Sequence, residues 1–198
     1  MQVEHLPLAG ALLITPKVIG DDRGYFLESW NRRRFAEALG IPETEVPRFD
    51  QDNQSRSSRG VLRGLHYQVA PEPQAKLVRC VAGEIFDVAV DLRRNSASFG
   101  QWTGARLSGT NHRQLWVPVG FAHGFLTLSD TAEVLYKTAG YWNRACERSL
   151  RWNDPAIGID WPLDDLAGLE PLLTSKDAEA PTLAAALAAG DVFTEPTV

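Results

Sequence analysis

Apolar and polar residues alternate through most of the first two thirds of the chain, which is the period of a β-strand with one buried face. The alternation predicts strands over residues 11–19, 25–30, 59–68, 76–81, 84–92, 101–107, 113–117, 124–128 and 133–137. Turn clusters such as residues 20–24 (GDDRG) separate these segments. Short strands at roughly 8–12-residue spacing predict a sandwich or closed barrel rather than a fold of alternating strands and helices.

Two segments carry helix signals instead. Asn31 is a suitable N-cap for a short helix over Arg32 to Leu39, which Gly40 would end. From about residue 153 the chain becomes rich in Ala, Leu, Asp and Pro, and a second helix is predicted over Thr182 to Ala189. We therefore expect an all-β protein with a short C-terminal helical cover, forming one domain over residues 1–198.

Composition narrows the class of protein. A chain of 198 residues with 44% hydrophobic and 23% charged residues is typical of a soluble globular domain with a real core. A net charge of −5 argues against nucleic-acid binding, which needs a basic surface. The sequence has no recognisable signal peptide and no apolar run of membrane-spanning length, so we expect a cytoplasmic protein with no membrane contact. Cys80 and Cys146 lack a disulfide or zinc spacing and are expected to be free thiols.

The stretch from Arg59 to Gln68 (RGVLRGLHYQ) carries the clearest chemical signal. It combines strand alternation with two glycines, Arg63 and His66. A guanidinium is a permanent anion clamp, and an imidazole titrates near neutral pH. Together these groups predict acid–base chemistry on an anionic substrate.

A second motif indicates the kind of β fold. Residues 118–123 (PVGFAH) have the Pro-x-Gly-x-x-His pattern of the second motif of cupins, which are jelly rolls (double-stranded β-helices). Many cupins bind a transition metal through a His-x-His pair and a Glu in their first motif, plus this later His. Here the first-motif region supplies His66 alone, and two histidines make a poor metal site. We therefore expect a cupin-type jelly roll without a metal.

Ten motifs occur in order along the chain, and as a linked set they are specific. They are Asp22–Glu28, Gln51–Asn53, Val61–Gln68, Lys76–Cys80, Gly83–Asp91, Phe99–Trp102, Pro118–Phe125, Leu135–Lys137, Trp152–Asp154 and Ser175–Asp177. This set resembles the dTDP-4-dehydrorhamnose 3,5-epimerase family, which consists of cofactor-free isomerases of deoxysugar nucleotide pathways. The resemblance runs over about residues 12–181, which would form the catalytic core.

The resemblance implies catalytic roles for four residues. His66 matches the general base that removes a proton beside the sugar's 4-keto group, and Asp177 matches the carboxylate that orients that imidazole. Tyr136 matches the general acid that returns a proton from the opposite face of the ring. Lys76, with Arg63 as a second candidate, would stabilise the enolate oxygen electrostatically, without a metal or other cofactor.

The resemblance also implies a set of substrate contacts and an oligomeric state. Cationic side chains among them suit a diphosphate. Trp142 departs from the family, which commonly has Tyr where the thymine ring stacks, and an indole can also stack. The family is typically homodimeric, and an exchanged N-terminal strand would carry Arg23 and Glu28 to the partner's site. The matching positions are Arg23, Glu28, Gln51, Asn53, Arg63, His123, Trp142, Glu147 and Lys176.

The implied reaction is epimerisation of dTDP-4-dehydro-6-deoxy-D-glucose at C3, C5 or both, in dTDP-L-rhamnose or related deoxysugar biosynthesis. Action at C3 alone or C5 alone, as in antibiotic sugar pathways, stays open. So do a metal-dependent cupin enzyme and a non-catalytic sugar-nucleotide-binding cupin. At single positions, His123 could instead satisfy loop packing, and Tyr136 could be a cross-strand core aromatic.

Overall fold

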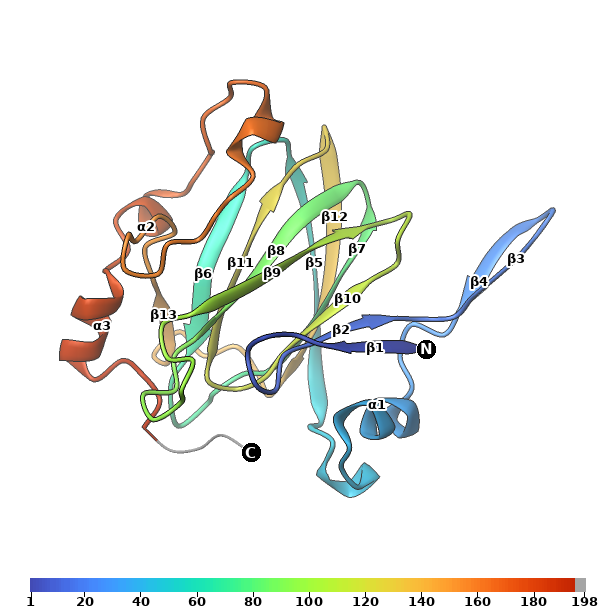
Figure 1. The fold of residues 1–198 in the computed structure, drawn as a ribbon, viewed down its shortest axis with the longest axis horizontal. Helices are drawn as coiled ribbons and strands as arrows, with labels where there is room; N and C mark the ends of the chain where they lie inside the picture. The colour runs from blue at the N-terminus through green and yellow to red at the C-terminus, as the bar shows by residue number, and fades with distance from the viewer. Residues whose placement is uncertain (195–198) are drawn as a thin grey trace.

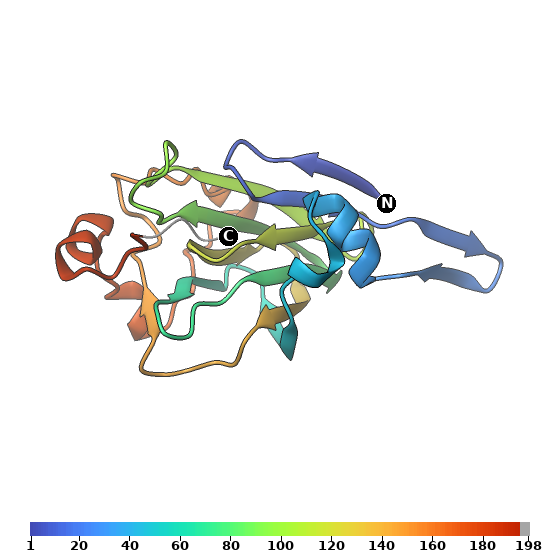
Figure 2. The same cartoon turned by 90° about the horizontal axis from the view of Figure 1, so that it is seen from below.

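Two antiparallel sheets pack face to face in a cupin-type jelly roll, which this computed structural model describes for residues 1–194 (Figures 1 and 2). One sheet has the strand order β1-β2-β10-β7-β12-β5, and the other has the order β13-β6-β11-β8-β9. The strands are β1 Gln2–His5, β2 Leu12–Thr15, β3 Val18–Asp21, β4 Gly24–Leu27, β5 Phe49–Ser58, β6 Leu62–Gln68, β7 Lys76–Ala82, β8 Glu84–Asp91, β9 Trp102–Ser108, β10 Gln114–Val117, β11 Phe121–Thr127, β12 Thr131–Ala139 and β13 Glu147–Ser149. The expected fold class is confirmed, while residues 195–198 of the predicted domain lie outside the described residues.

Seven of the nine predicted strands coincide with β6 to β12 to within a few residues. The prediction of one strand over residues 11–19 is wrong, because the chain leaves the six-stranded sheet after β2 and starts the separate β3–β4 hairpin. Pro16 stands at this break, and proline has no N–H for a sheet ladder. The strand predicted over residues 25–30 is β4, which ends at Leu27.

Strands β1, β5 and β13 were not predicted. The largest of them, β5, has ten residues (FDQDNQSRSS) and pairs only with β12, at the edge of the six-stranded sheet. Its sequence is almost entirely polar, so it lacks the apolar alternation on which the prediction depends. An edge strand can be polar because only one of its neighbours is a strand and part of its surface faces solvent.

The capping signals predicted both longer helices. Helix α1 spans Arg32–Leu39; Asn31 Oδ1 accepts the backbone N–H of Arg34 at 3.1 Å, and Gly40 ends the helix with φ 68°. Helix α3 spans Leu183–Ala189, so Thr182 is its N-cap rather than its first residue. The C-terminal cover also contains η2 (Leu163–Leu166) and the short α2 (Ser175–Ala178), while η1 (Glu43–Glu45) follows α1.

Two apolar clusters hold the sheets in place. The first lies between the inner faces of both sheets and includes Val78 and Leu115 opposite Ile85 and Phe125. The second lies between the five-stranded sheet and the C-terminal cover, where Trp161, Leu166 and Leu183 are its members from the cover. Burial of each large apolar side chain contributes roughly 1.5–3 kcal/mol. Strands β8 and β11 have members in both clusters and so have apolar neighbours on both faces, which makes their positions rigid, while β6 has members only in the second cluster.

The β3–β4 hairpin projects away from the body of the molecule (Figures 1 and 2). Its large apolar side chains are mostly exposed, although the Tyr25 ring contacts that of His112 at a centroid distance of 4.7 Å: Ile19 is 57% exposed, Tyr25 61% and Phe26 67%. Contiguous exposed apolar surface of this kind marks an interaction site in a soluble protein.

Strands β6 and β11 approach each other closely at two glycines. A Cβ on Gly124 would lie 2.7 Å from the carbonyl oxygen of Arg63 and 3.1 Å from the Cα of Gly64. Gly124→Ala should therefore push the strands apart and lower the free energy of unfolding by about 1–3 kcal/mol or more, as measured by urea denaturation. In the control Gly20→Ala, the new methyl group would meet its nearest neighbour, the carbonyl oxygen of Gly24, at 3.6 Å, so stability should change by at most about 0.5 kcal/mol. Equal effects of the two substitutions would contradict this account.

Candidate active site

A polar cavity of about 150 Å³ opens between the two sheets. Strands β5, β7 and β12 line it from the six-stranded sheet, and β6 and β13 line it from the five-stranded sheet. Most of the site residues expected from the sequence are therefore gathered at one place. The lining residues are Gln51, Asn53, His66, Tyr67, Gln68, Gln74, Lys76, Tyr136, Trp142 and Glu147.

His66 and Asp177 form a hydrogen-bonded pair at the wall of this cavity. His66 Nε2 lies 2.6 Å from Asp177 Oδ1, and the carboxylate is buried while the imidazole is about one third exposed. Thr174 caps α2 by accepting the backbone N–H of Asp177, which fixes the carboxylate. Because the carboxylate oxygen accepts a hydrogen bond from Nε2–H, the pairing leaves Nδ1 as the basic nitrogen of His66.

Burial is the largest single effect on Asp177 and opposes its ionisation, but the hydrogen bond and charge of His66, together with hydrogen bonds from Thr174 and the backbone of Gly64, outweigh burial and lower the pKa of the carboxyl below its ordinary value. The charged form of Asp177 is thus the stable form at neutral pH. A negative carboxylate beside the imidazole in turn stabilises the imidazolium that forms when His66 takes up a proton.

Tyr136 enters the cavity from the sheet opposite His66. It lies on β12, directly paired with Asn53 of β5 and Val78 of β7. Burial raises the pKa of its phenol, and the nearby Arg63 opposes that rise only in part. Tyr136 is therefore protonated at neutral pH and able to donate a proton.

Lys76 is buried and is the first residue of β7, and its Nζ donates a hydrogen bond to the backbone carbonyl of His66 at 3.2 Å. Burial lowers the pKa of its ammonium group to about 8, against the opposing attraction of Asp87 and Glu147. A desolvated cation of this kind interacts strongly with a negative charge that develops nearby.

Polar contacts order the outer rim of the cavity. Gln51 donates to Asn53 Oδ1 at 2.9 Å and accepts the backbone N–H of Trp142 at 3.1 Å. Lys176 Nζ lies 2.6 Å from Glu147 Oε2. The Trp142 side chain is 53% exposed, so a face of the indole is accessible beside this rim.

His123 and Arg63 lie at the margins of the cavity rather than among its lining residues. His123 is buried on β11, directly opposite His66 of β6, and its Nε2 lies 2.8 Å from Asp87 Oδ1. Arg63 donates through Nε to Ser57 Oγ at 3.0 Å. Sequence reasoning missed Asp87, although a carboxylate within the apolar strand IFDVAV was a signal worth following.

Two expected substrate contacts are far from the cavity within the chain. Arg23 lies at the tip of the β3–β4 hairpin, is 89% exposed in its side chain and pairs with Asp21. Glu28 contacts Asn31 and Arg34 at the start of α1. Neither residue lines the cavity that contains His66.

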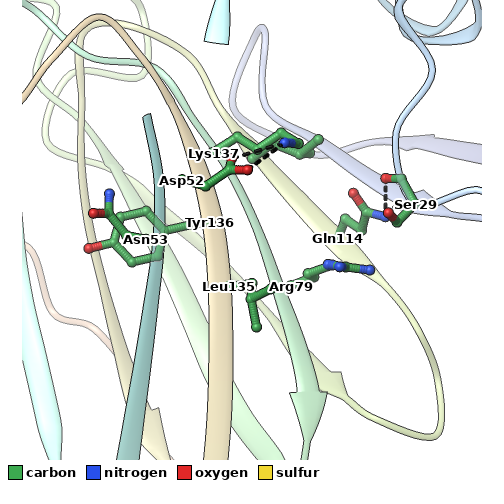
Figure 3. A pocket seen from close by; sticks show the side chains of 9 residues that line it. Ser29, Asp52, Asn53, Arg79, Gln114, Leu135, Tyr136 and Lys137 are labelled. Atoms are coloured by element: carbon green, nitrogen blue, oxygen red, sulfur yellow. Dashed lines mark hydrogen bonds and ion pairs between the residues drawn. The ribbon is translucent and has the colours of Figure 1, made fainter. Parts of the chain in front are cut away.

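A second hollow of about 270 Å³ lies against the other side of the six-stranded sheet, and Asn53 and Tyr136 are among the lining residues of both hollows. Figure 3 shows Tyr136 and Asn53 on the opposite side of β12 from Asp52 and Lys137, which form an ion pair at 2.9 Å. Leu135 and Arg79 also face the second hollow (Figure 3). A shift of one residue in β12 would exchange Tyr136 and Lys137 between the two sides.

The described part of the chain, residues 1–194, contains no group of three or more His, Cys, Asp or Glu side chains placed to hold a metal ion. Within the same residues, no helix is both long enough and apolar enough to span a membrane.

In this jelly roll an imidazole on one sheet pairs with a carboxylate from helix α2, and a protonated tyrosine and a buried lysine lie on the other sheet. These are the groups of an isomerase that removes and returns a proton. Residues 5–185 match the sequence profile described as dTDP-4-dehydrorhamnose 3,5-epimerase. The chain belongs to the dTDP-4-dehydrorhamnose 3,5-epimerase family and is an isomerase of that family.

Individual relatives support this assignment over nearly the whole chain. The dTDP-4-dehydrorhamnose 3,5-epimerase of Pseudomonas aeruginosa is 54% identical over 184 residues, which are 93% of this chain and 97% of that protein. A 3,5-epimerase from Legionella pneumophila in complex with dTDP-4-keto-L-rhamnose has 46% identity and a TM-score of 0.90, with 98% of both chains covered. A 4-keto-6-deoxy sugar epimerase from the novobiocin cluster of Streptomyces spheroides has 41% identity and a TM-score of 0.90, with 100% and 94% covered.

Asp177 should make stability depend on acidic pH. Since folding lowers the pKa of its carboxyl, its contribution is fully present above the unfolded value near 4 and is lost as pH falls through the lower folded value. Asp177→Asn should therefore reduce the free energy of unfolding by about 1–2 kcal/mol at pH 7, and the difference should shrink toward pH 2. Urea denaturation at a series of pH values and fixed protein concentration measures both the loss of stability at pH 7 and its decrease toward pH 2. The exposed control Asp160→Asn should show no such trend; a pH-independent difference for Asp177→Asn would contradict the assignment.

Proposed function

We propose that the protein inverts dTDP-4-dehydro-6-deoxy-D-glucose at both C3 and C5, as a step in dTDP-L-rhamnose or related deoxysugar biosynthesis. The observation that carries this proposal is the approach of His66 and Tyr136 from opposite sheets into one cavity. Inversion of a carbon needs proton removal on one side and proton delivery on the other. A ketone makes both adjacent C–H groups acidic enough for an imidazole to act on them.

In the proposed reaction, His66 Nδ1 takes the proton from the carbon beside the ketone, and the C–H electron pair forms the enolate. The negative charge moves to the former carbonyl oxygen, where the Lys76 ammonium stabilises it. Tyr136 then donates its proton to the opposite face of the same carbon, and the carbonyl reforms. Asp177 holds the His66 ring and stabilises its protonated form throughout. Protons balance because the phenolate left on Tyr136 and the imidazolium on His66 return to their starting states through solvent.

The remaining candidate residues serve substrate binding in this proposal. Arg63 and Lys176 are cations at the margin of the cavity and suit the diphosphate. Trp142 offers an exposed indole face for the thymine ring. Gln51, Asn53 and Glu147 provide polar contacts at the rim. His123, buried on β11 and hydrogen-bonded to Asp87, is a further candidate contact at the margin of the cavity.

The protein is proposed to act as a cytoplasmic homodimer, with the whole chain as one functional unit. The mostly exposed apolar face of the β3–β4 hairpin supports a second copy as its partner. Such a contact would also give Arg23 and Glu28, which lie away from their own cavity, a role in the partner's site.

Phe26→Ser should weaken the proposed dimer because it replaces the most exposed aromatic side chain of the hairpin by a polar one. Light scattering coupled to size exclusion should show a dimer for the unmodified protein and a larger monomer fraction for the variant. Leu169→Ser is the matched control, since Leu169 is 56% exposed in the C-terminal cover. A monomeric unmodified protein, or equal dissociation of both variants, would overturn the dimer proposal.

Deuterium exchange tests the catalytic proposal directly. With the 4-keto sugar nucleotide in D2O, NMR should show deuterium entering at both C3 and C5. His66→Ala should reduce both exchange rates by roughly 10²–10⁴-fold, because no other base replaces the imidazole. Tyr136→Phe should allow exchange but impair inversion.

His5→Ala is the control for the histidine substitution, since His5 is exposed on the edge strand β1 and should leave exchange unchanged. Absence of exchange in the unmodified protein would overturn the proposal as a whole. Full activity of His66→Ala would overturn only the assignment of the base. Stoichiometric transition metal in active protein, with activity lost on its removal, would favour a metal-dependent cupin enzyme instead.

Epimerisation at one carbon is the second candidate function. It is supported by the likeness to the epimerase of the novobiocin cluster and by the bulky Trp142 beside the cavity. Exchange at C3 or C5 alone in the same experiment would select this candidate.

A further inference from the structure

Asp87 is a fully buried carboxylate that the roles described above do not use. It lies in the middle of β8, and its Oδ1 accepts a hydrogen bond from His123 Nε2 at 2.8 Å. Its Oδ2 is also buried and has no hydrogen-bond partner among residues 1–194. A buried carboxylate is costly unless a positive charge or several donors compensate it. One hydrogen bond is therefore too little to explain why this charge is kept in the core.

His123 does not supply the missing positive charge. Burial lowers the pKa of its imidazole, and although Asp87 opposes this effect, Lys76 and His66 reinforce it. The ring is thus neutral at pH 7, with its proton on the nitrogen that faces Asp87. The positive charge that would compensate the Asp87 carboxylate must therefore come from another group.

Lys76 is the buried cation nearest to hand in this cluster: its Nζ donates to the carbonyl of His66, and His66 stands directly opposite His123, the partner of Asp87. Burial lowers the pKa of the ammonium group to about 8, and Asp87 contributes the largest attraction that opposes the decrease, ahead of Glu147. The pKa of Lys76 therefore lies only about one unit above neutral pH, so a small further decrease would leave the amine uncharged. Other polar and charged groups also surround the cavity that Lys76 lines. They are His66 on β6, His123 on β11, Tyr136 on β12, Gln51 and Asn53 on β5, Glu147 on β13, and Asp177 and Lys176 on α2.

We propose that Asp87 is a positioning residue of the active site: its buried carboxylate keeps Lys76 in the ammonium form and fixes His123 with its proton on Nε2. The proposal rests on the proposed function only in the role of Lys76 at the enolate oxygen. The state of the Lys76 amine itself can be measured without substrate. A neutral amine could not stabilise the enolate, so Asp87 would act on catalysis without touching the sugar.

Asp87→Asn isolates the charge, because an Asn oxygen can still accept the hydrogen bond from His123. In protein labelled with [¹³C]lysine, NMR can follow the titration of all four lysines, and Lys76→Gln identifies the Lys76 signal. Lys76 should titrate near pH 8 in the unmodified protein and about one pH unit or more lower in Asp87→Asn. The other three lysines should not change.

Asp91→Asn is the matched control. Asp91 is equally buried, lies on the same strand and accepts hydrogen bonds from Arg93, Ser96 and Ser98 away from the cavity. This variant removes a buried charge and can lose stability, but the titration of Lys76 should stay at its original pH.

The effect on catalysis is measured from the dependence of kcat on pH, on the alkaline side where activity falls. Activity should fall as Lys76 loses its proton, and this fall should move to lower pH in Asp87→Asn by the same amount as the NMR titration. For a shift of one pH unit, kcat at pH 8 should fall about fivefold relative to the unmodified enzyme. The fall should not move in Asp91→Asn.

An unchanged Lys76 titration in Asp87→Asn would overturn the proposal, whatever the exchange experiment on the sugar shows. A shifted titration with no catalysis by the unmodified protein would instead overturn the proposed function and leave the electrostatic pairing standing. If Asp87→Asn does not fold, the smaller Asp87→Ser removes the same charge and carries the same expectation. A Lys76 that titrates below pH 7 in the unmodified protein would also overturn the proposal, since Asp87 would then fail to keep it charged.

Discussion

The face-to-face packing of two antiparallel sheets is the constraint on which the site depends. Packed sheets stand about 10 Å apart, and alternate residues of each strand point into the space between them. Apolar side chains such as Val78 and Ile85 fill most of that space, while polar ones leave a cavity. An acid and a base placed on opposite sheets therefore face opposite sides of whatever lies between them.

Burial then sets the protonation states within this space. It keeps the Tyr136 phenol protonated and brings the Lys76 ammonium close to losing its proton. Specific partners counteract burial where a charge is needed, as His66 does for Asp177. The site thus uses no group with unusual intrinsic chemistry. Its reactivity comes from the balance between desolvation and a few nearby charges.

Much of the fold was predictable because its signals are local. Alternation identified β6 to β12, and the caps Asn31 and Gly40 identified the ends of α1. Prediction failed for β5, whose polar residues line the cavity instead of an apolar core. It also failed at Pro16, where the choice between one long strand and a projecting hairpin depends on what the chain packs against. Asp87 was not predicted as part of the site, because the sequence around an acidic residue in a strand does not indicate which distant residue it will pair with, here His123.

The sequence by itself determined the class of fold, helices α1 and α3 and the choice of candidate reactive side chains, because periodicity, capping and residue chemistry are properties of neighbouring positions. Only the tertiary structure decided that His66 meets Asp177 from a distant helix, that Tyr136 faces the cavity, and that Arg23 lies outside it. These outcomes depend on strand register and sheet packing, which join residues far apart along the chain. The shifts in pKa depend on burial, and burial exists only once the sheets have closed on each other.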